Sequence, residues 1–185
     1  AASVGRPLPG TDVVVVAPVR HTPVPAGATG EVRARGPQLM SRYLGDDGAT
    51  ARSLGRDGWL RTGDVGWLDE AGRLHVEGRA DDMIERDGRR WLPGPVERAV
   101  AGAGGAAEAV VVAGPGGDVV AFVRPQPGRT VDEDAVRRAV TEACGPGLVP
   151  DRIVVLDELP ALPSGKVRRF ELRRHLELEL AGQAV

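Results

Sequence analysis

The stretch Gly78-Arg-Ala-Asp-Asp-Met-Ile84 divides the sequence into two parts with different patterns. On its N-terminal side, short runs of β-branched residues are separated by glycines and by Asp-Gly or Ala-Gly turn signals. On its C-terminal side, apolar residues recur at helical spacing between further strand-like runs. This change predicts a domain boundary between Gly78 and Asp82, with residues 1–79 in one domain and residues 80–185 in the other.

Residues 1–79 are predicted to be rich in β-strands. The β-branched run Asp12–Ala17 follows a Pro-Gly turn signal, and Glu31–Arg35 alternates apolar and charged residues. Further short strands are expected at Trp59-Leu60, Val65–Leu68 and Leu74–Val76, and Asp46–Leu54 has room for one short helix. Several short strands with frequent glycines are typical of part of a small barrel or sandwich.

Residues 80–185 are predicted to mix helices and strands. The clearest helix is Thr130–Cys144, where Thr130 and Glu133 fit a capping box and Gly145 follows as a stop signal. Other helices are expected at Pro93–Ala101 and Phe170–Ala181, and strands at Ala107–Ala113, Val119–Val123 and Arg152–Leu156. The pattern therefore predicts an α+β fold: a β-rich, barrel-like segment followed by a small α+β domain with a short antiparallel sheet and flanking helices.

The composition argues against several classes of protein. The formal net charge of the 185 residues is −2, without the strongly basic character of a nucleic-acid binder. No apolar run approaches the roughly 20 residues that a membrane-spanning helix needs. The single cysteine, Cys144, cannot form an internal disulfide, which favours the cytoplasm. Because Cys144 lies on the apolar side of a predicted helix end, we interpret it as a small buried hydrophobe.

Two nucleotide-binding motifs are matched only in part, and no metal motif is present. Gly102–Ala107 fits G-x-G-x-x-A, but a helix precedes it and a strand follows, the reverse of a dinucleotide-binding turn. Gly165-Lys166 lacks the remaining residues of a P-loop, because Pro160 and Val167 stand where Gly and Ser or Thr are required. The three histidines share no ligand spacing with the cysteine, so no metal site is expected.

One feature of the composition singles out Lys166. It is the one lysine among 24 basic residues, the others being arginine. The arginine excess reflects a general bias, under which a surface cation would be expected to become arginine. A site that needs a compact ammonium would keep its lysine, because the planar guanidinium does not replace it.

Seven segments in order carry a resemblance to a known family: Gly5–Gly10, Gly30–Gly36, Tyr43–Gly45, Asp57-Gly-Trp-Leu-Arg-Thr-Gly-Asp64, Gly78–Ile84, Pro93–Glu97 and Leu162-Pro-Ser-Gly-Lys166. Together they resemble the C-terminal portion of adenylate-forming (AMP-binding) enzymes of the acyl- or aryl-CoA synthetase type. The resemblance covers nearly the whole chain. It implies that residues 1–79 end the large adenylation domain and that residues 80–185 form a mobile lid domain.

The resemblance implies nucleotide-binding roles for Asp64 and Arg79. Asp64, in Thr62-Gly-Asp64, corresponds to an aspartate that accepts hydrogen bonds from the ribose hydroxyls of ATP, which suits an acceptor-only carboxylate. A plain β-turn aspartate is the alternative interpretation. Arg79 corresponds to an arginine that also contacts the nucleotide, and its alternative is a surface ion pair.

The resemblance also implies a hinge at Asp81 and a thiol-access loop at Gly88. A hinge residue must absorb a large change of φ and ψ, and aspartate tolerates unusual backbone angles better than most residues. The neighbouring Asp82 leaves the assignment open by one residue, and an ordinary turn or cap aspartate is the alternative. Gly88 has the alternative of a plain hairpin glycine.

Lys166 is implied as the catalytic residue. In adenylation, a carboxylate attacks the α-phosphorus of ATP, and an ammonium delivered by a closing domain stabilises the phosphoryl and carboxylate oxygens together. The alternative is a solvated lysine on a basic strip with Arg168 and Arg169. The implied cofactors are ATP, Mg²⁺ and coenzyme A, and no metal ligand is assigned in this chain.

The phosphate loop and acyl pocket of the family have no counterpart in these residues, which implies that the chain is incomplete for catalysis alone. The implied partners are the N-terminal body, in cis or in trans, a carboxylic acid, and CoA or carrier-protein pantetheine. Gly78–Ile84 favours the CoA-ligase branch. The chain departs from the family pattern at Pro95, at the short loop Gly114–Asp118 and at Gly145–Pro150. Two alternatives remain: a non-catalytic stand-alone interaction module derived from a ligase, and a fragment of a peptide-synthetase adenylation domain.

Overall fold

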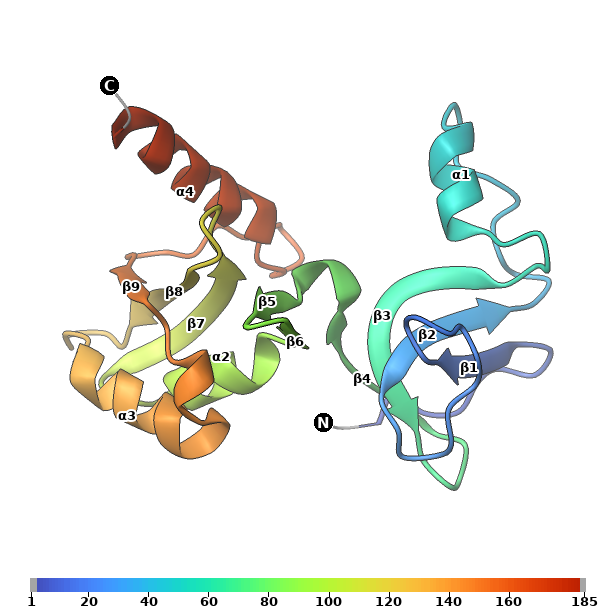
Figure 1. Cartoon of the computed structure of the whole chain (residues 1–185), viewed down its shortest axis with the longest axis horizontal. Coiled ribbons are helices and arrows are strands. Elements are labelled where there is room, and N and C mark those ends of the chain that lie inside the picture. The colour runs from blue at the N-terminus through green and yellow to red at the C-terminus, as the bar shows by residue number, and fades with distance from the viewer. Residues whose placement is uncertain (1–2, 184–185) are drawn as a thin grey trace. The chain divides into compact units, whose positions relative to one another are not determined.

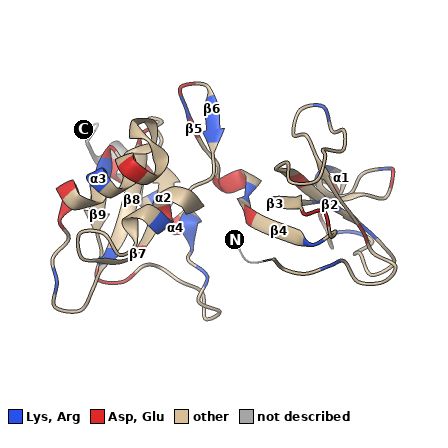
Figure 2. Ribbon diagram, turned by 90° about the horizontal axis from the view of Figure 1, so that it is seen from below, with Lys and Arg blue, Asp and Glu red and all other residues tan. Residues whose placement is uncertain are grey.

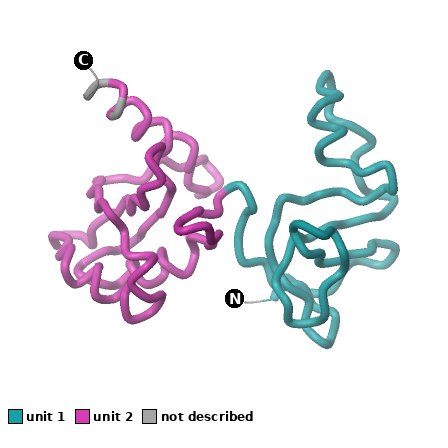
Figure 3. The backbone as a smooth tube through the Cα atoms, in the orientation of Figure 1, with its two compact units in different colours: residues 1–81 teal, residues 82–185 magenta. Residues whose placement is uncertain are grey.

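The computed structural model describes residues 3–183, apart from the side chains at positions 180, 182 and 183 (Figure 1). The chain forms two compact units, Ala1–Asp81 and Asp82–Val185 (Figure 3). No helix among the residues described is long and apolar enough to cross a bilayer.

The first unit is built on one four-stranded antiparallel sheet with the order β1-β2-β3-β4. Its strands are β1 (Asp12–Val16), β2 (Gly30–Arg35), β3 (Leu60–Leu68) and β4 (Leu74–Arg79). These four strands form an open, curved sheet without closing into a barrel. The short helix α1 (Asp47–Ser53) is capped by Asp46, whose side chain accepts a hydrogen bond from the Ala49 amide at 2.7 Å.

A register shift between β3 and β4 bends the sheet next to the Thr62-Gly-Asp64 segment. Val65 pairs with Gly78 and Gly66 pairs with Val76, so Glu77 is an extra residue on β4. Gly66 allows this close pairing, since a Cβ there would lie 2.2 Å from the His75 carbonyl oxygen. The bulge is adjacent in the ladder to the Asp64–Arg79 pair, and it therefore affects the direction in which these two side chains project.

The second unit begins with a small hairpin and continues as a mixed sheet with helices. Its strands are β5 (Ile84–Arg86), β6 (Arg89–Trp91), β7 (Ala106–Ala113), β8 (Val119–Pro125) and β9 (Arg152–Val155). Its helices are α2 (Gly94–Val100), α3 (Glu133–Cys144) and α4 (Arg169–Gln183). Short 3₁₀ turns occur at η1 (Ala80–Asp82), which spans the unit boundary, and at η2 (Pro146–Leu148).

The α+β class predicted from the sequence is confirmed, with one refinement of the second sheet. Its order is β7-β8-β9, where β7 and β8 are antiparallel but β8 and β9 are parallel. The sheet is therefore mixed and not wholly antiparallel. The reason is the connection through α3, because a helical crossover returns the chain in the same direction as β8.

Helices cover both faces of the β7-β8-β9 sheet, which gives the second unit two apolar clusters (Figure 1). On β7, Val111 belongs to the cluster with α2 and α3, whereas Val110 and Val112 belong to the cluster with Leu172 and Leu176 of α4. This separation follows from the alternation of side chains along a strand. The α4 cluster is the one that also holds Val167, next to Lys166.

The predicted start of the third helix is wrong by three residues. Helix α3 begins at Glu133, and its cap is Asp132, whose side chain accepts from the Ala135 amide at 3.0 Å. Thr130 and Glu133 therefore do not form the capping box. Asp132 competes successfully because aspartate is at least as good a helix cap as threonine. The end at Cys144 is as predicted, with Gly145 in the left-handed region at φ 84°.

Candidate functional site

Lys166 lies at the end of a tight hairpin in the second unit. The Gly165 amide donates to the Leu162 carbonyl at 2.8 Å, and the Leu162 amide donates to the Lys166 carbonyl at 2.8 Å. Gly165 has φ 81°, which closes the three-residue loop in a way that only glycine does without strain. Ala161 and Val167 form a β-bridge below this loop. The sequence Leu-Pro-Ser-Gly-Lys therefore makes an ordered, projecting loop.

The Lys166 side chain is exposed, and no hydrogen bond or ion pair holds its ammonium within residues 3–183. The two arginines that follow are different. Arg168 pairs with Glu171 at 2.7 Å, and Arg169 pairs with Glu97 at 2.7 Å. Arg168 and Arg169 are thus paired with carboxylates, whereas the Lys166 ammonium has no such partner among the residues described.

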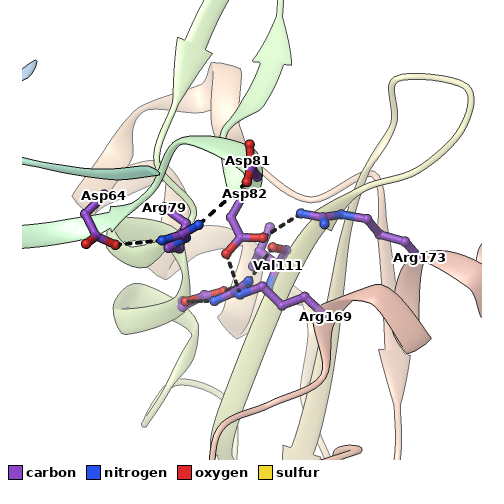
Figure 4. Close-up of polar contacts among 8 residues, drawn as sticks. Asp64, Arg79, Asp81, Asp82, Val111, Arg169 and Arg173 are labelled. Atoms are coloured by element: carbon purple, nitrogen blue, oxygen red, sulfur yellow. Dashed lines mark hydrogen bonds and ion pairs between the residues drawn. The ribbon is translucent and has the colours of Figure 1, made fainter. Parts of the chain in front are cut away.

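Asp64 and Arg79 meet across β3 and β4 in the first unit (Figure 4). The Arg79 Nη1 atom donates to Asp64 Oδ1 at 3.1 Å and to the Thr62 carbonyl at 2.7 Å. Thr62 Oγ1 donates to the Val32 carbonyl at 2.8 Å and accepts from the Asp64 amide at 3.0 Å. These bonds fix the Thr62-Gly-Asp64 backbone and orient the carboxylate.

The arrangement leaves Asp64 able to accept from a ligand. Its side chain is 33% exposed, and Arg79 contacts only its Oδ1 atom, so Oδ2 has no donor among the residues described. Gly63 brings the backbone under the Arg79 guanidinium, since a Cβ at this position would lie 2.6 Å from Arg79 Nη2. Its φ of 75° also favours glycine.

The neighbouring aspartates at the unit boundary differ sharply. Asp81 closes the first unit, its side chain is 84% exposed, and its carboxylate lies 3.8 Å from Arg79 Nη2. Asp82 opens the second unit, its side chain is 19% exposed, and it pairs with Arg173 at 2.8 Å and with Arg169 at 3.5 Å (Figure 4). Asp82 is thus anchored by ion pairs within the second unit, whereas Asp81 is the last residue of the first unit.

Gly88 occupies the two-residue turn between β5 and β6. Arg86 pairs with Arg89, and the two loop residues Asp87 and Gly88 have φ of 54° and 70°. Two consecutive positive φ angles are typical of a type I′ turn. A Cβ at Gly88 would meet nothing within 4 Å, so glycine is favoured here by the backbone angle and not by lack of space. The adjoining β6 strand carries arginines, coloured blue in Figure 2.

Other reactive groups do not add to these sites. Burial raises the pKa of the Cys144 thiol, which keeps it protonated at neutral pH and agrees with its interpretation as a small apolar side chain. Within residues 3–183, no three His, Cys, Asp or Glu side chains gather in a way that could hold a metal ion.

Comparison with known proteins gives the family. The profile of the AMP-binding enzyme C-terminal domain matches residues 95–166. Indoleacetate–CoA ligase from Aromatoleum aromaticum is 38% identical over 178 residues, which cover 94% of this chain and 34% of that enzyme. Residues 95–166 belong to the AMP-binding C-terminal domain family, and the chain aligns with the C-terminal part of adenylate-forming enzymes.

Two solved structures of adenylate-forming enzymes extend this finding. ATP-bound MatB from Rhodopseudomonas palustris has a TM-score of 0.87 and 29% identity, over 94% of this chain and 35% of that one. The o-succinylbenzoate CoA synthetase of Bacillus subtilis, in complex with its acyl-adenylate intermediate, has a TM-score of 0.79 and 28% identity, over 92% of this chain and 35% of that one. The chain thus spans about a third of the length of these relatives.

Among the residues that the resemblance singled out, the structure brings Asp64, Arg79 and Asp81 together in the first unit. Lys166 and Gly88 belong to the second unit. The sequence did not predict the ion pairs next to the boundary, in which Asp82 pairs with Arg169 and Arg173, and Arg169 also pairs with Glu97. The signal was weak, because arginine is so frequent in this chain that no single arginine stands out.

Proposed function

We propose that this chain is the C-terminal part of an AMP-forming carboxylate–CoA ligase, in which it delivers Lys166 to the reacting groups. The observation that carries this proposal is the Lys166 ammonium, exposed and without a partner among the residues described, at the end of an ordered hairpin. A free cation on a rigid support is what stabilisation of developing negative charge requires.

The first half-reaction is adenylation. A carboxylate oxygen forms a bond to the α-phosphorus of ATP, the bond from that phosphorus to the bridging oxygen breaks, and pyrophosphate leaves. We propose that Lys166 binds an oxygen of the carboxylate and an oxygen of the α-phosphoryl group, holding them in line as charge shifts between them. Positioning and charge stabilisation of this kind are worth on the order of 10²–10³ in rate.

Asp64 and Arg79 are proposed to bind the nucleotide. The unused Oδ2 of Asp64 is suited to accept hydrogen bonds from ribose hydroxyls, while Arg79 holds Oδ1 and so fixes the orientation of the carboxylate. This support explains why the segment needs glycine at position 63.

The second half-reaction is thioester formation, in which the CoA sulfur attacks the acyl carbonyl, the bond to AMP breaks and the thiol proton is released. We propose that residues 1–79 end the large adenylation domain, that residues 80–185 are its mobile lid, and that the lid turns about Asp81 between the half-reactions. The high exposure of Asp81 and the anchoring of Asp82 support Asp81 as the hinge. Gly88 is proposed to lie in the loop that the thiol passes.

The chain supplies only part of the site. We propose that Mg²⁺ is held by ATP phosphates and by residues of the N-terminal body, and no step above passes through it. The body that binds the acid, ATP and CoA is a partner in cis or in trans. The single cysteine supports a cytoplasmic location.

The test uses the full-length protein that contains this chain, with Lys166→Ala. Adenylation is measured as carboxylate-dependent exchange of pyrophosphate into ATP, and thioester formation is measured from a chemically prepared acyl-adenylate. We expect adenylation to fall about 10²–10³-fold while transfer to CoA is spared. Equal loss of both half-reactions, or no loss of adenylation, would contradict the proposal.

The alternatives give different results in the same assays. A non-catalytic module derived from a ligase would show no activity that depends on Lys166 and would bind another protein stably. A peptide-synthetase fragment would adenylate but transfer the acyl group to a pantetheinyl carrier protein in preference to free CoA.

A further inference from the structure

Four charged side chains join the base of the Lys166 loop to the first residue of the second unit. We call Asp82, Glu97, Arg169 and Arg173 the anchor cluster. The exposed fractions of their side chains are 19%, 17%, 23% and 33%, so the cluster is largely withdrawn from water. Its members come from η1, α2 and α4, which are far apart in the sequence (Figure 4).

Arg169 is the centre of the anchor cluster. Its Nη1 lies 2.7 Å from Glu97 Oε1 and its Nη2 donates to Glu97 Oε2 at 3.0 Å, a two-pronged contact. Nη1 also donates to the Val111 carbonyl at 3.0 Å, and Nε lies 3.5 Å from Asp82 Oδ2. Glu97 in turn accepts from the Val111 amide at 2.8 Å. One planar guanidinium thus ties α4 to α2, β7 and Asp82, which a lysine ammonium cannot reproduce.

Arg169 lies three residues after Lys166, and the residues between them are also fixed. Val167 packs against the α4 apolar cluster, and the Arg168 amide donates to the Pro160 carbonyl at 2.7 Å. The other limb of the hairpin enters through Leu159, which is 9% exposed. The hairpin therefore has a firmly held base and an exposed end that carries the ammonium.

We propose that Arg169 is a positioning residue that sets where Lys166 is presented relative to the rest of the lid. This inference rests on the proposed function, because it assigns Arg169 to the adenylation step through Lys166. A misplacement of about 1 Å in a reacting group can cost on the order of 10² in rate. Loss of the two-pronged contact frees the start of α4 and with it the outgoing limb of the hairpin.

The experiment compares Arg169→Met with a matched control in the full-length protein. The control is Arg152→Met, since Arg152 also pairs with a carboxylate of α4, Glu179, at 2.8 Å, but comes from β9 and not from the Lys166 hairpin. Both half-reactions are measured as above. We expect R169M to lower the adenylation rate roughly 10- to 100-fold and to leave transfer from acyl-adenylate near the parent rate. R152M is expected to leave both near the parent rate.

A double variant separates positioning from a general structural effect. If Arg169 acts through Lys166, then K166A/R169M adenylates at the same rate as K166A, because the two losses are coupled and not additive. Should R169M prevent folding, Glu97→Gln replaces it, since it removes the charge and one carboxylate oxygen from the contact but keeps an acceptor for the Val111 amide. E97Q is then expected to lower adenylation selectively.

The inference is overturned if the folded variant lowers both half-reactions alike, if it lowers neither, or if R169M lowers the rate further in the K166A background. A failure of the proposed function would give a different result, because it would be seen in the K166A single variant. Unchanged adenylation in K166A would remove the role of Lys166 whatever the Arg169 variants do.

Discussion

Replacing Gly63 by alanine tests the proposed nucleotide-binding role of the Thr62-Gly-Asp64 segment directly. Gly63 has φ 75°, and an added Cβ would lie 2.6 Å from Arg79 Nη2. Two costs follow. An alanine in the left-handed region costs about 1–2 kcal/mol of folding free energy. The clash itself is relieved cheaply, because a guanidinium is the far end of a flexible side chain, but relief moves Arg79 away from Asp64.

The matched control is Gly72→Ala in the turn between β3 and β4 of the same unit. Gly72 has φ 72°, and a Cβ there would meet nothing within 4 Å. The backbone cost is therefore the same, about 1–2 kcal/mol, while Arg79 stays in place. We expect both variants to lower the melting temperature of the full-length protein by similar amounts.

The two variants should differ in their response to ATP. The Arg79–Asp64 contact is a hydrogen bond between charged groups, of the kind worth about 1.5–3 kcal/mol when it is well shielded, and the exposure of Arg79 places it at or below the lower end. We therefore expect G63A to raise KM for ATP by about tenfold, with G72A near the parent value. Equal KM values in the two variants, measured by pyrophosphate exchange at matched folded fraction, would refute the proposed support of Asp64 by Arg79.

Three further outcomes are expected. Phe122→Ala should lower the free energy of unfolding of the second unit by about 3–5 kcal/mol, because Phe122 is fully buried beneath α4. The loss would be measured as faster hydrogen exchange of the α4 amides, and unchanged protection of these amides would contradict the prediction. Asp132→Ala should destabilise α3 by about 1 kcal/mol and Thr130→Ala by clearly less, since Asp132 is the observed cap. Hydrogen exchange of the Ala135 amide distinguishes the two variants. A larger loss of protection in Thr130→Ala than in Asp132→Ala would support the capping box instead. The pKa of Asp69 is held well below its usual value by the Arg73 backbone amide, and by the Arg73 and His75 side chains. The ionised Asp69 carboxylate therefore stabilises the fold fully above its unfolded-state pKa of about 3.9, and this stabilisation is lost as pH falls through the lower folded-state pKa. The melting-temperature gap between the parent and Asp69→Asn should therefore be widest near neutral pH and narrow below about pH 4, and a gap that widens in acid would contradict this.

The sequence predicted most elements of the fold where a strong local pattern exists. Helix α3 places Val136 and Val140 on its buried face, as the helical spacing required. The error at its start has a local cause: two capping residues lie close together, and the pattern cannot say which one the chain uses. The parallel pairing of β8 and β9 had no local signal, because strand direction depends on how the α3 crossover packs on the sheet.

The candidate site likewise has residues that the sequence alone can propose and residues that only the folded structure brings together. The residues that the resemblance assigns to the site lie in short recognisable segments, so the sequence alone could propose them. The anchor cluster could not be proposed in this way, because Glu97 and Arg169 are 72 residues apart and only the folded sheet brings them together. The two aspartates at the boundary have nearly the same sequence context, and their different contacts could be seen only in the structure.

The contrast between Lys166 and Arg169 explains how one lysine can persist beside so many arginines. At Arg169 the cation contacts one carboxylate with two nitrogens, and it also contacts a carbonyl and a second carboxylate, which favours the guanidinium fork. At Lys166 the chain offers no partner among the residues described. In the proposed mechanism, this cation leaves water, reaches two oxygens of a reacting pair and withdraws when the lid turns. A compact ammonium on a flexible stem suits that task. Lys166→Arg in the full-length protein should then adenylate well below the parent rate even though the charge is kept. Near-parent exchange of pyrophosphate in that variant would show that charge alone suffices at position 166.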